Sequence, residues 1–290
     1  MPSAHLTDRG VVRVTGEDAR SFLDGLVTSD MDKVRVDGAR YAALLSPQGK
    51  ILFDFIVAEA DGEQMGGGFV LDCPRALAAD LAKRLGMYKL RAKVSVENLS
   101  DTLAVVAYWG GERGGDGAGV LYPDPRHPAL GDRLVTDAAR AADLSTATAD
   151  DWRAHRIALG VPQGGQDFTY ADAFPHEANM DQLGGVDFDK GCYVGQEVVS
   201  RMQHRGNART RIVPVRFEGG FSADEGAEVV AGDKVAGRIG STAPGGIGLA
   251  LVRLDRIEDA LTAGQPISAG GLPLRLAKPD YATFKVPGAD

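Results

Sequence analysis

Short apolar runs alternate with glycine-containing turns along most of this chain. The sequence holds 38 glycines in 290 residues, and glycine adopts tight-turn conformations more freely than any other residue. After Gly206 the pattern is most regular, and such short, evenly spaced β-type runs are typical of a small barrel. These runs are 211–217, 229–230, 235–239, 248–252 and 273–276. The sequence therefore predicts a strand-rich fold that ends in a β-barrel.

The residues before Gly206 mix strand and helix patterns. Two apolar runs, 40–45 and 51–58, flank a Pro/Gly turn, which predicts a hairpin. Other runs predict further strands, and apolar residues at helical spacing predict helices. Strands are expected at 11–14, 69–72, 92–96 and 102–108, and helices around 22–27, at 77–85 with Gly86 as the stop, and at 151–159.

The order of these elements is strand–helix, two strands, strand–helix, two strands. It favours an α+β domain with mixed or antiparallel sheets and flanking helices over a doubly wound sheet. We therefore predict two domains, 1–206 and a C-terminal β-barrel over 207–290.

Several classes of function are disfavoured. A net charge of −8 argues against a general nucleic-acid binder, which needs a basic surface. The glycine-rich run 110–119 lacks the ending of a phosphate-binding loop and is predicted as a hairpin tip. No second cysteine lies at zinc-ligand spacing from Cys192, and no His-Glu-x-x-His motif occurs, so no metal site is predicted.

Cysteine usage and hydropathy indicate the compartment. Two cysteines in a chain of this length form no disulfide framework, which fits a reducing environment. The N-terminus shows no apolar core of the signal-peptide kind, and no run approaches the roughly 20 apolar residues that span a bilayer. We therefore expect a cytoplasmic protein with no membrane partner.

One octapeptide places a cysteine where chemistry is a better explanation than packing. It reads Lys190-Gly191-Cys192-Tyr193-Val194-Gly195-Gln196-Glu197. Apolar residues at helical spacing predict a helix over 195–205, so Cys192 precedes a helix N-terminus. The positive helix end and Lys190 both favour a thiolate, whereas Glu197 would oppose it if it points at the sulfur.

The two cysteines have different expected roles. Cys73 precedes Pro74 and follows an apolar strand, so we interpret it as structural. Cys192 could likewise be a small apolar filler at a turn, but its polar and glycine neighbours favour a functional thiol. A cysteine-protease site would need a partnered histidine, and only sequence proximity favours His176 or His204.

The octapeptide and the segments around it resemble a known family. The segments are Pro175-His176-Glu177-Ala178-Asn179-Met180, Gly184-Gly185-Val186-Asp187-Phe188, KGCYVGQE and Arg201. Together they look like the YgfZ-type folate-binding proteins, a group that includes mitochondrial iron–sulfur assembly factors and is related to the glycine-cleavage T-protein, an aminomethyltransferase. The K-G-C-[FY]-x-G-Q-E signature separates this branch from true T-proteins. The resemblance extends over most of the chain, including the Thr28-Ser29-Asp30 turn and the C-terminal barrel.

The resemblance implies a tetrahydrofolate site. Glu177 matches the glutamate that holds the pterin, and a carboxylate can accept two parallel hydrogen bonds from such a ring edge. Tyr41 matches a folate-contacting tyrosine, and Asp54 matches the aspartate that assists one-carbon transfer, although Phe53 stands where T-proteins carry a second acid. Arg209 or Arg211 matches an arginine near the folate tail.

Each of these residues also has a plainer interpretation. Asp54 could be a solvent-side residue of an alternating strand, Tyr41 could be sheet packing, and Glu177 could cap a turn. The basic run that includes Arg209 and Arg211 could be a solvated face, or it could meet the carboxylates of a folate tail.

Three functions follow from the resemblance. The first is a tetrahydrofolate-binding accessory protein for assembly or repair of 4Fe–4S enzymes, with Cys192 as an essential thiol and with assembly machinery or client enzymes as partners. The second is a folate-dependent aminomethyltransferase. The third is a non-catalytic module in which folate is only a structural ligand. Whether the protein is an enzyme, which folate it binds, its client enzymes and its oligomeric state stay open.

Overall fold

The computed structural model describes residues 1–35, 38–60, 67–111, 118–206 and 208–289. It divides into two compact units, Met1–Trp152 with Leu183–Gln196, and Arg153–Gln182 with Glu197–Asp290. The chain therefore returns to the first unit for the segment that carries all of the octapeptide except Glu197. The domain boundary expected after residue 206 stays a prediction. The predicted hairpin tip at 110–119 falls partly in 112–117, outside the described residues.

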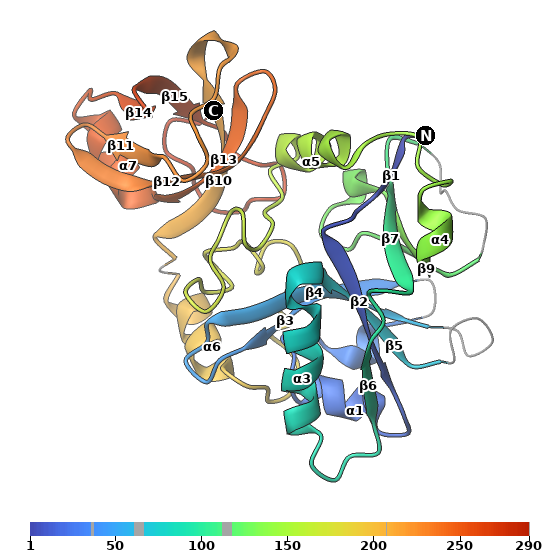
Figure 1. Ribbon diagram of the computed structural model, residues 1–290. Helices are drawn as coiled ribbons and strands as arrows, with labels where there is room; N and C mark the ends of the chain where they lie inside the picture. Colours follow the sequence, from blue (N-terminus) through green and yellow to red (C-terminus); the bar gives the residue numbers. More distant parts are fainter. Residues whose placement is uncertain (36–37, 61–66, 112–117, 207, 290) are drawn as a thin grey trace. The chain divides into compact units, whose positions relative to one another are not determined.

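A five-stranded antiparallel sheet forms the centre of the first unit. Its order is β3-β4-β5-β2-β6 (Figure 1). The strands are β2 Arg9–Thr15, β3 Ala39–Leu45, β4 Ile51–Glu59, β5 Phe69–Pro74 and β6 Ser95–Asn98. Apolar residues of this sheet share one core with two helices, α1 Ala19–Asp24 and α3 Ala78–Tyr88. The hairpin predicted around the Pro/Gly turn is confirmed as β3 and β4.

A second sheet of the first unit has the order β1-β7-β9-β8, again antiparallel. Its strands are β1 Ser3–His5, β7 Leu103–Tyr108, β8 Val120–Pro123 and β9 Asp132–Asp137, and the short helix α4 Ala138–Ala141 packs beside them. The sequence pattern indicated β7 but not β1, β8 or β9.

Helix α3 continues past the glycine predicted to stop it. Its last residue is Tyr88, and Lys89 at the C-cap keeps helical dihedral angles. Glycine in an exposed helix costs only about 1 kcal/mol relative to alanine. The fully buried Leu81 and Leu85 outweigh that cost.

The second unit contains a closed six-stranded barrel with the order β10-β13-β12-β11-β14-β15. The strands are β10 Thr210–Phe217, β11 Glu228–Ala231, β12 Lys234–Ala243, β13 Ile247–Arg253, β14 Ile267–Ala269 and β15 Leu272–Leu276. Helix α7 Leu254–Thr262, which the sequence pattern did not indicate, adds Ile257 and Ala260 to the barrel core. The predicted fold class, α+β with antiparallel sheets, flanking helices and a C-terminal barrel, is confirmed.

The described residues contain two further α-helices and four 3₁₀ turns. They are α5 Ala149–Ala158, α6 Gln196–Arg205, and the 3₁₀ turns η1 Met31–Lys33, η2 Arg75–Leu77, η3 Pro128–Leu130 and η4 Glu218–Gly220. Helix α6 confirms the helix predicted over 195–205. Among the described helices, none combines the length and the apolar character needed to span a membrane.

Candidate functional site

The turn after α1 ties the β3–β4 hairpin to the segment before the octapeptide. The Thr28 hydroxyl donates to the Gly185 carbonyl at 2.6 Å and accepts from the Ala43 amide at 2.9 Å. The Asp187 amide donates to the Thr28 carbonyl at 2.9 Å. The Ser29 hydroxyl donates to the Tyr41 carbonyl at 2.5 Å. Residues distant in sequence are thereby held together by buried hydrogen bonds.

Lys190 is an anchor of the octapeptide. Its ammonium donates to the carbonyls of Asp24, Val27 and Ser29 at 2.6, 2.9 and 3.0 Å, and lies 3.2 Å from the Asp24 carboxylate. These carbonyls lie at and just beyond the C-terminus of α1, where a cation is favoured. Burial lowers the pKa of Lys190, although Asp24 opposes that effect. The Lys190 ammonium is thus held by backbone carbonyls. The expectation that it also favours a thiolate at Cys192 stays a prediction.

Tyr193 and Gly195 fix the other side of the cysteine. Tyr193 is buried, its ring centroid lies 5.4 Å from the Lys190 ammonium, and burial raises its pKa to about 12. Gly195 has φ +82°, and a Cβ there would lie 2.5 Å from the Ser46 carbonyl in the β3–β4 turn. Only glycine suits both this dihedral angle and this close approach.

Cys192 lies between these anchors with its side chain exposed. It precedes α6 by a few residues, as the sequence predicted. Cys73 is fully buried, its thiol lies 3.7 Å from the Gly10 carbonyl, and burial raises its pKa to about 12. Because the thiolate is the reactive form, Cys73 is chemically quiet and Cys192 is the accessible thiol.

Tyr41 and Asp54 form a buried pair on neighbouring strands. The Tyr41 hydroxyl donates to Asp54 Oδ2 at 2.9 Å, and the two residues are 2% and 4% exposed. Burial raises the pKa of Tyr41 well above its ordinary value, and the charge of Asp54 adds to this. Asp54 is therefore not the solvent-side residue that a simple alternating strand would give.

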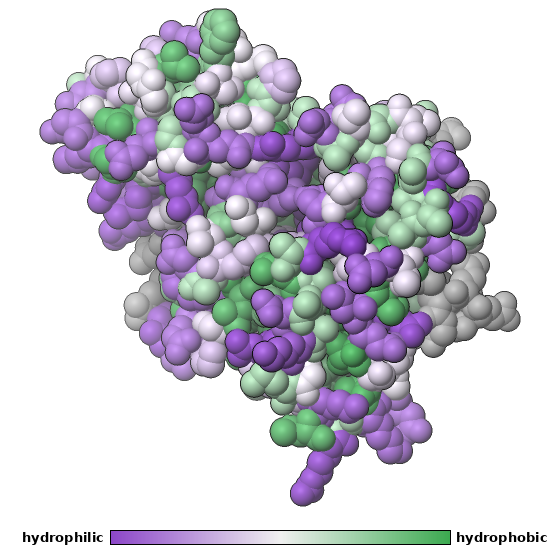
Figure 2. Space-filling view, in the orientation of Figure 1, coloured by the Kyte–Doolittle hydropathy of each residue, from purple (hydrophilic) through white to green (hydrophobic). Residues whose placement is uncertain are grey.

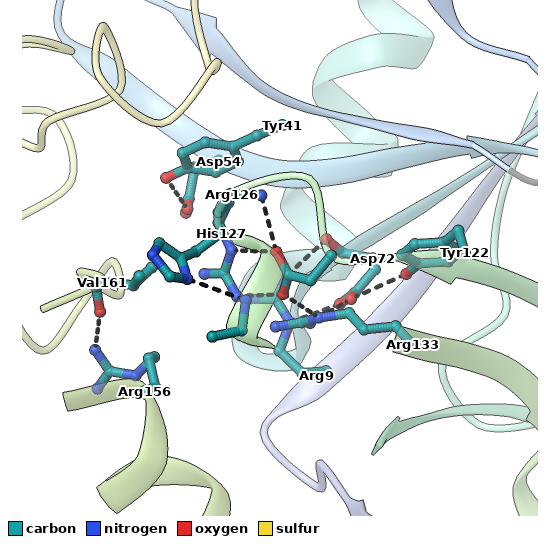
Figure 3. Close-up of polar contacts among 12 residues, drawn as sticks. Arg9, Tyr41, Asp54, Asp72, Tyr122, Arg126, His127, Arg133, Arg156 and Val161 are labelled. Atoms are coloured by element: carbon teal, nitrogen blue, oxygen red, sulfur yellow. Dashed lines mark hydrogen bonds and ion pairs between the residues drawn. The ribbon is translucent and has the colours of Figure 1, made fainter. Parts of the chain in front are cut away.

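A buried network of charges lies beside this pair and was not foreseen from the sequence. Its members are Arg9, Asp72, Tyr122, Asp124, Arg126 and Arg133, all less than 10% exposed. The Arg126 guanidinium lies 5.8 Å from the Tyr41 ring centroid and binds Asp124 at 2.7 and 2.9 Å. Arg133 bridges Asp124 at 2.8 Å and Asp72 at 2.5 Å. Figure 3 shows the Tyr41–Asp54 hydrogen bond near Arg126 and, separately, the contacts that Asp72 makes with its partners.

Each carboxylate of the network is paired with arginines. Arg9 binds the Asp72 carboxylate at 2.6 Å, and the Tyr122 hydroxyl donates to the same carboxylate at 3.2 Å. Burial alone would raise the pKa of Asp72, but Arg9 and Arg133 overcome it and leave the pKa lowered. Arg126 and Arg133 lower the pKa of Asp124 in the same way against its burial. A charged residue inside an apolar strand, such as Asp72 in Phe69–Pro74, was the available sequence signal.

Glu177 belongs to the second unit and lines a pocket there. Its Oε2 accepts from the Phe174 amide at 2.9 Å, so it does cap a turn. Within the described residues, its other oxygen has no hydrogen-bond partner. The pocket holds about 260 Å³ and is lined by Phe174, Glu177, Met202, Ala208, Arg209, Thr210 and Arg253. Two of the predicted folate residues, Glu177 and Arg209, therefore share one small pocket.

Arg211 points into the second unit instead. Its guanidinium binds Asp181 at 2.6 and 3.0 Å, donates to the His176 carbonyl at 2.7 Å, and lies 4.6 Å from the Phe284 ring centroid. At 6% exposure it serves the interior, so Arg209 is the predicted arginine that a ligand can reach.

The Pro175–Met180 motif also has structural duties. The Asn179 amide donates to the Ile212 carbonyl at 2.7 Å, and Asn179 has φ +58°, a conformation that asparagine tolerates. The His176 ring pairs with Gln203 at 3.0 Å. Within the described residues, no group of three or more His, Cys, Asp or Glu side chains is arranged to hold a metal ion.

Comparisons with known proteins agree with this architecture. Residues 5–112 match the GCVT N-terminal domain, and residues 209–284 match the CAF17 C-terminal beta-barrel domain. The chain is 34% identical over 292 residues to the iron–sulfur cluster assembly factor IBA57 homolog, mitochondrial, of Pyricularia oryzae, covering 91% of this chain and 75% of that protein. It is also 34% identical over 286 residues to human iron–sulfur cluster assembly factor IBA57, mitochondrial, covering 88% and 78%.

The chain belongs to the IBA57 family of iron–sulfur cluster assembly factors. Among solved structures, it resembles the glycine cleavage system aminomethyltransferase T from Bartonella henselae, with a TM-score of 0.74 and 15% identity over 100% of this chain and 88% of that one. That likeness shows a shared fold. The resemblance stated from the sequence is confirmed at the level of the T-protein-like fold and its iron–sulfur assembly branch.

The family also corrects one prediction. The sequence led us to expect a cytoplasmic protein, because no leader was recognised. The IBA57 relatives of Pyricularia oryzae, Mycosarcoma maydis and humans are all named as mitochondrial proteins, so the cytoplasmic prediction is wrong. Hydropathy of the N-terminus was too weak a guide to compartment.

Proposed function

We propose that this protein is an accessory factor for the assembly or repair of 4Fe–4S enzymes, with Cys192 as its essential thiol. The observation that carries the proposal is the exposure of Cys192 between two buried anchors, Lys190 and Tyr193. The thiolate is both the nucleophile and the metal ligand of cysteine. An exposed thiol on a fixed loop can reach iron, a cluster or a sulfur atom of a partner protein. The names of the IBA57 relatives support the assembly role.

Replacing the sulfur tests the proposal. Cys192→Ser should fold with an unchanged melting temperature and should fail to restore 4Fe–4S enzyme activities in a strain that lacks the gene. The matched control is Gly191→Ala, because a Cβ at Gly191 meets nothing within 4 Å. This control alters the loop and keeps the thiol, so it should restore activity. Full restoration by Cys192→Ser would refute the role of the thiol.

We also propose that the second unit binds tetrahydrofolate or a derivative. Glu177 presents an oxygen that has no partner among the described residues to a pocket with apolar side chains on its wall, which suits the hydrogen-bonding edge of a pterin ring. At about 260 Å³ this pocket is smaller than the roughly 300–1,000 Å³ that usually encloses a drug-sized ligand. It therefore fits part of a folate molecule, and Arg209 could meet a tail carboxylate.

Binding measurements separate this role from turn capping. In Glu177→Gln the amide oxygen can still accept from the Phe174 amide, so the turn should persist while the charge is lost. Tetrahydrofolate affinity, measured by calorimetry, should fall at least tenfold. The control is Glu228→Gln on β11, an exposed position outside the pocket, which should bind like the wild type. Equal affinity for both variants would remove Glu177 from the site.

An aminomethyltransferase is the second candidate, and the buried Tyr41–Asp54 pair favours it. A carboxylate held at 2.9 Å from a neutral phenol is a positioned hydrogen-bond acceptor of the kind that general acid–base catalysis uses. Turnover with an aminomethyl-loaded lipoyl carrier, abolished by Asp54→Asn, would support this function. If the wild type binds folate but shows no turnover, the aminomethyltransferase function is excluded and the accessory role remains.

A further inference from the structure

The end of helix α3 carries a cluster of positive charge that none of the functions above uses. We define the α3 tip as residues 83–93, with the sequence KRLGMYKLRAK. It contains five cationic residues and no acidic residue, whereas the whole chain has a net charge of −8. The cationic residues are Lys83, Arg84, Lys89, Arg91 and Lys93. The tip is thus a local basic surface on an acidic protein.

Most of these cations form no ion pair in the part of the chain that the structure describes. Lys93 forms an exposed pair with Glu17 at 2.6 Å. For the other four, no ion pair occurs within the described residues, and all four side chains are exposed. Cations in the last turn of a helix favourably oppose its dipole, which accounts for part of this charge. The dipole does not account for the apolar residues among them.

Two large apolar side chains project from the same tip. Met87 is 66% exposed and Leu90 is 90% exposed, whereas Leu81 and Leu85 on the preceding turns of α3 are fully buried. At the lower tip of the face drawn in Figure 2, below the end of α3 in Figure 1, hydrophobic and hydrophilic residues project side by side. Methionine is enriched in the cores of interfaces, so a methionine and a leucine that are exposed beside cations in the sequence favour an interface over a solvated loop.

The backbone holds Leu90 in this exposed position against its own preference. Leu90 has φ +43°, a left-handed conformation that residues with a branched side chain rarely adopt. The turn around it is fixed from both sides. The Ala92 amide donates to the Lys89 carbonyl at 2.7 Å, and the Lys93 amide donates to Asp18 Oδ2 at 2.8 Å. Because the Leu90 side chain is not buried, it contributes almost no stability to the fold.

We propose that the α3 tip is a docking surface for a partner protein that presents an apolar pocket with an acidic rim. Leu90 and Met87 would enter the pocket, and Lys83, Arg84, Lys89 and Arg91 would face the rim. A strained, fixed leucine favours a protein pocket over a membrane, since a fluid bilayer gains nothing from holding one side chain in a set position. This inference depends on neither Cys192 nor folate.

The first experiment separates docking from folding. Asparagine tolerates the left-handed conformation, so Leu90→Asn should leave the melting temperature unchanged or higher while removing the apolar anchor. A second variant reverses four charges of the tip, with Lys83, Arg84, Lys89 and Arg91 all changed to Glu. Both full-length proteins should fold and retain the tetrahydrofolate affinity of the wild type.

The partner is captured and then measured directly. A photo-crosslinking amino acid placed at Met87 in living cells should trap a protein that the same group at Asp101, an exposed control position with a 99% exposed side chain, does not trap. The purified captured protein should bind the wild type with an affinity that falls as salt rises. Its affinity for Leu90→Asn and for the charge-reversed variant should be at least tenfold weaker.

Three results would overturn the proposal. The first is equal trapping at Met87 and Asp101. The second is equal affinity of the captured protein for the wild type and both variants. The third is salt-dependent binding of the wild type to vesicles of 30% phosphatidylglycerol in phosphatidylcholine, lost in Leu90→Asn, without binding to the captured protein. That last outcome would assign the tip to a membrane surface. These three results are independent of whether Cys192→Ser restores 4Fe–4S enzyme activities.

Discussion

The buried charge network and the cysteine segment, residues 190–196, both lie in the first unit but differ in how they place polar groups. In the network, Asp72 and Asp124 are each bound by two arginines and are shielded from water. In the cysteine segment the anchors Lys190 and Tyr193 are buried, and the thiol of Cys192 is left exposed. The first arrangement joins strands into one body. The second uses buried contacts to present one reactive atom.

The difference teaches that burial and reactivity are assigned to separate residues here. A buried ion pair is costly to break because the remaining partner keeps its charge without compensation. An exposed thiol on a fixed loop can change its chemical state without disturbing the core. Substitutions in the network should therefore affect stability, and substitutions at the thiol should affect function.

The largest expected effect is the loss of the Asp72 carboxylate. Asp72→Ala leaves Arg9 and Arg133 without their shared carboxylate and should lower the free energy of unfolding by about 3–5 kcal/mol. Urea titration measures this. Asp101→Ala, at an exposed pair with Arg75, is the control and should stay within about 0.5 kcal/mol of the wild type. A loss at Asp72 no larger than the control would mean that the network does not hold the unit together.

A smaller effect is expected at the anchor of the cysteine segment. Lys190→Met keeps the length of the side chain but removes the donor from three backbone carbonyls. The free energy of unfolding should fall by about 2 kcal/mol, because buried acceptors lose their partner. Lys89→Met, at an exposed position, should change it little. Stability unaltered in Lys190→Met would show that water replaces the ammonium and that the anchor is dispensable.

Acid should weaken the network through its carboxylates. The folded-state pKa values of Asp72 and Asp124 are lowered, so their stabilising contribution is complete above the unfolded-state pKa of about 3.9. As pH falls below that value, these carboxylates become protonated in the unfolded chain while they stay ionised in the folded chain, so the free energy of unfolding falls. The full loss, reached once both forms are titrated, is about 1.4 kcal/mol per unit of pKa difference. Urea midpoints from pH 6 to pH 2.5 should show this decline. Asp124→Asn should show a shallower one, and an equal slope would exclude Asp124 as a source.

The smallest effect on stability is expected at the exposed thiol. Cys192→Ser should change the free energy of unfolding by less than about 0.5 kcal/mol. A thiol reagent should modify one cysteine per folded chain, Cys192, and two after unfolding in urea, because Cys73 is buried. Rapid modification of both cysteines in the native protein would show that the core around Cys73 opens and that the contrast between the two thiols is weaker than the structure implies.

Local patterns predicted much of this molecule because the evidence for them lies within short windows. The β3–β4 hairpin, helix α6 and the barrel strands follow from periodicity and turn residues. The contrast between Cys73 and Cys192 was visible in their immediate neighbours. Helix α3 passes through Gly86 because buried leucines on the preceding turn outweigh one poor helix former, and no local signal weighs those terms.

The sequence by itself determined the fold class, the cysteine segment as the candidate site, and the family to which it points. The tertiary structure decided which side chains those residues meet. It turned Lys190 toward the carbonyls after α1, closed Arg211 onto Asp181, and joined Arg9, Asp72 and Arg133 from strands far apart in the chain. The physical reason is that a charge inside a protein must find a partner. Which partner it finds depends on contacts between segments that no local pattern records.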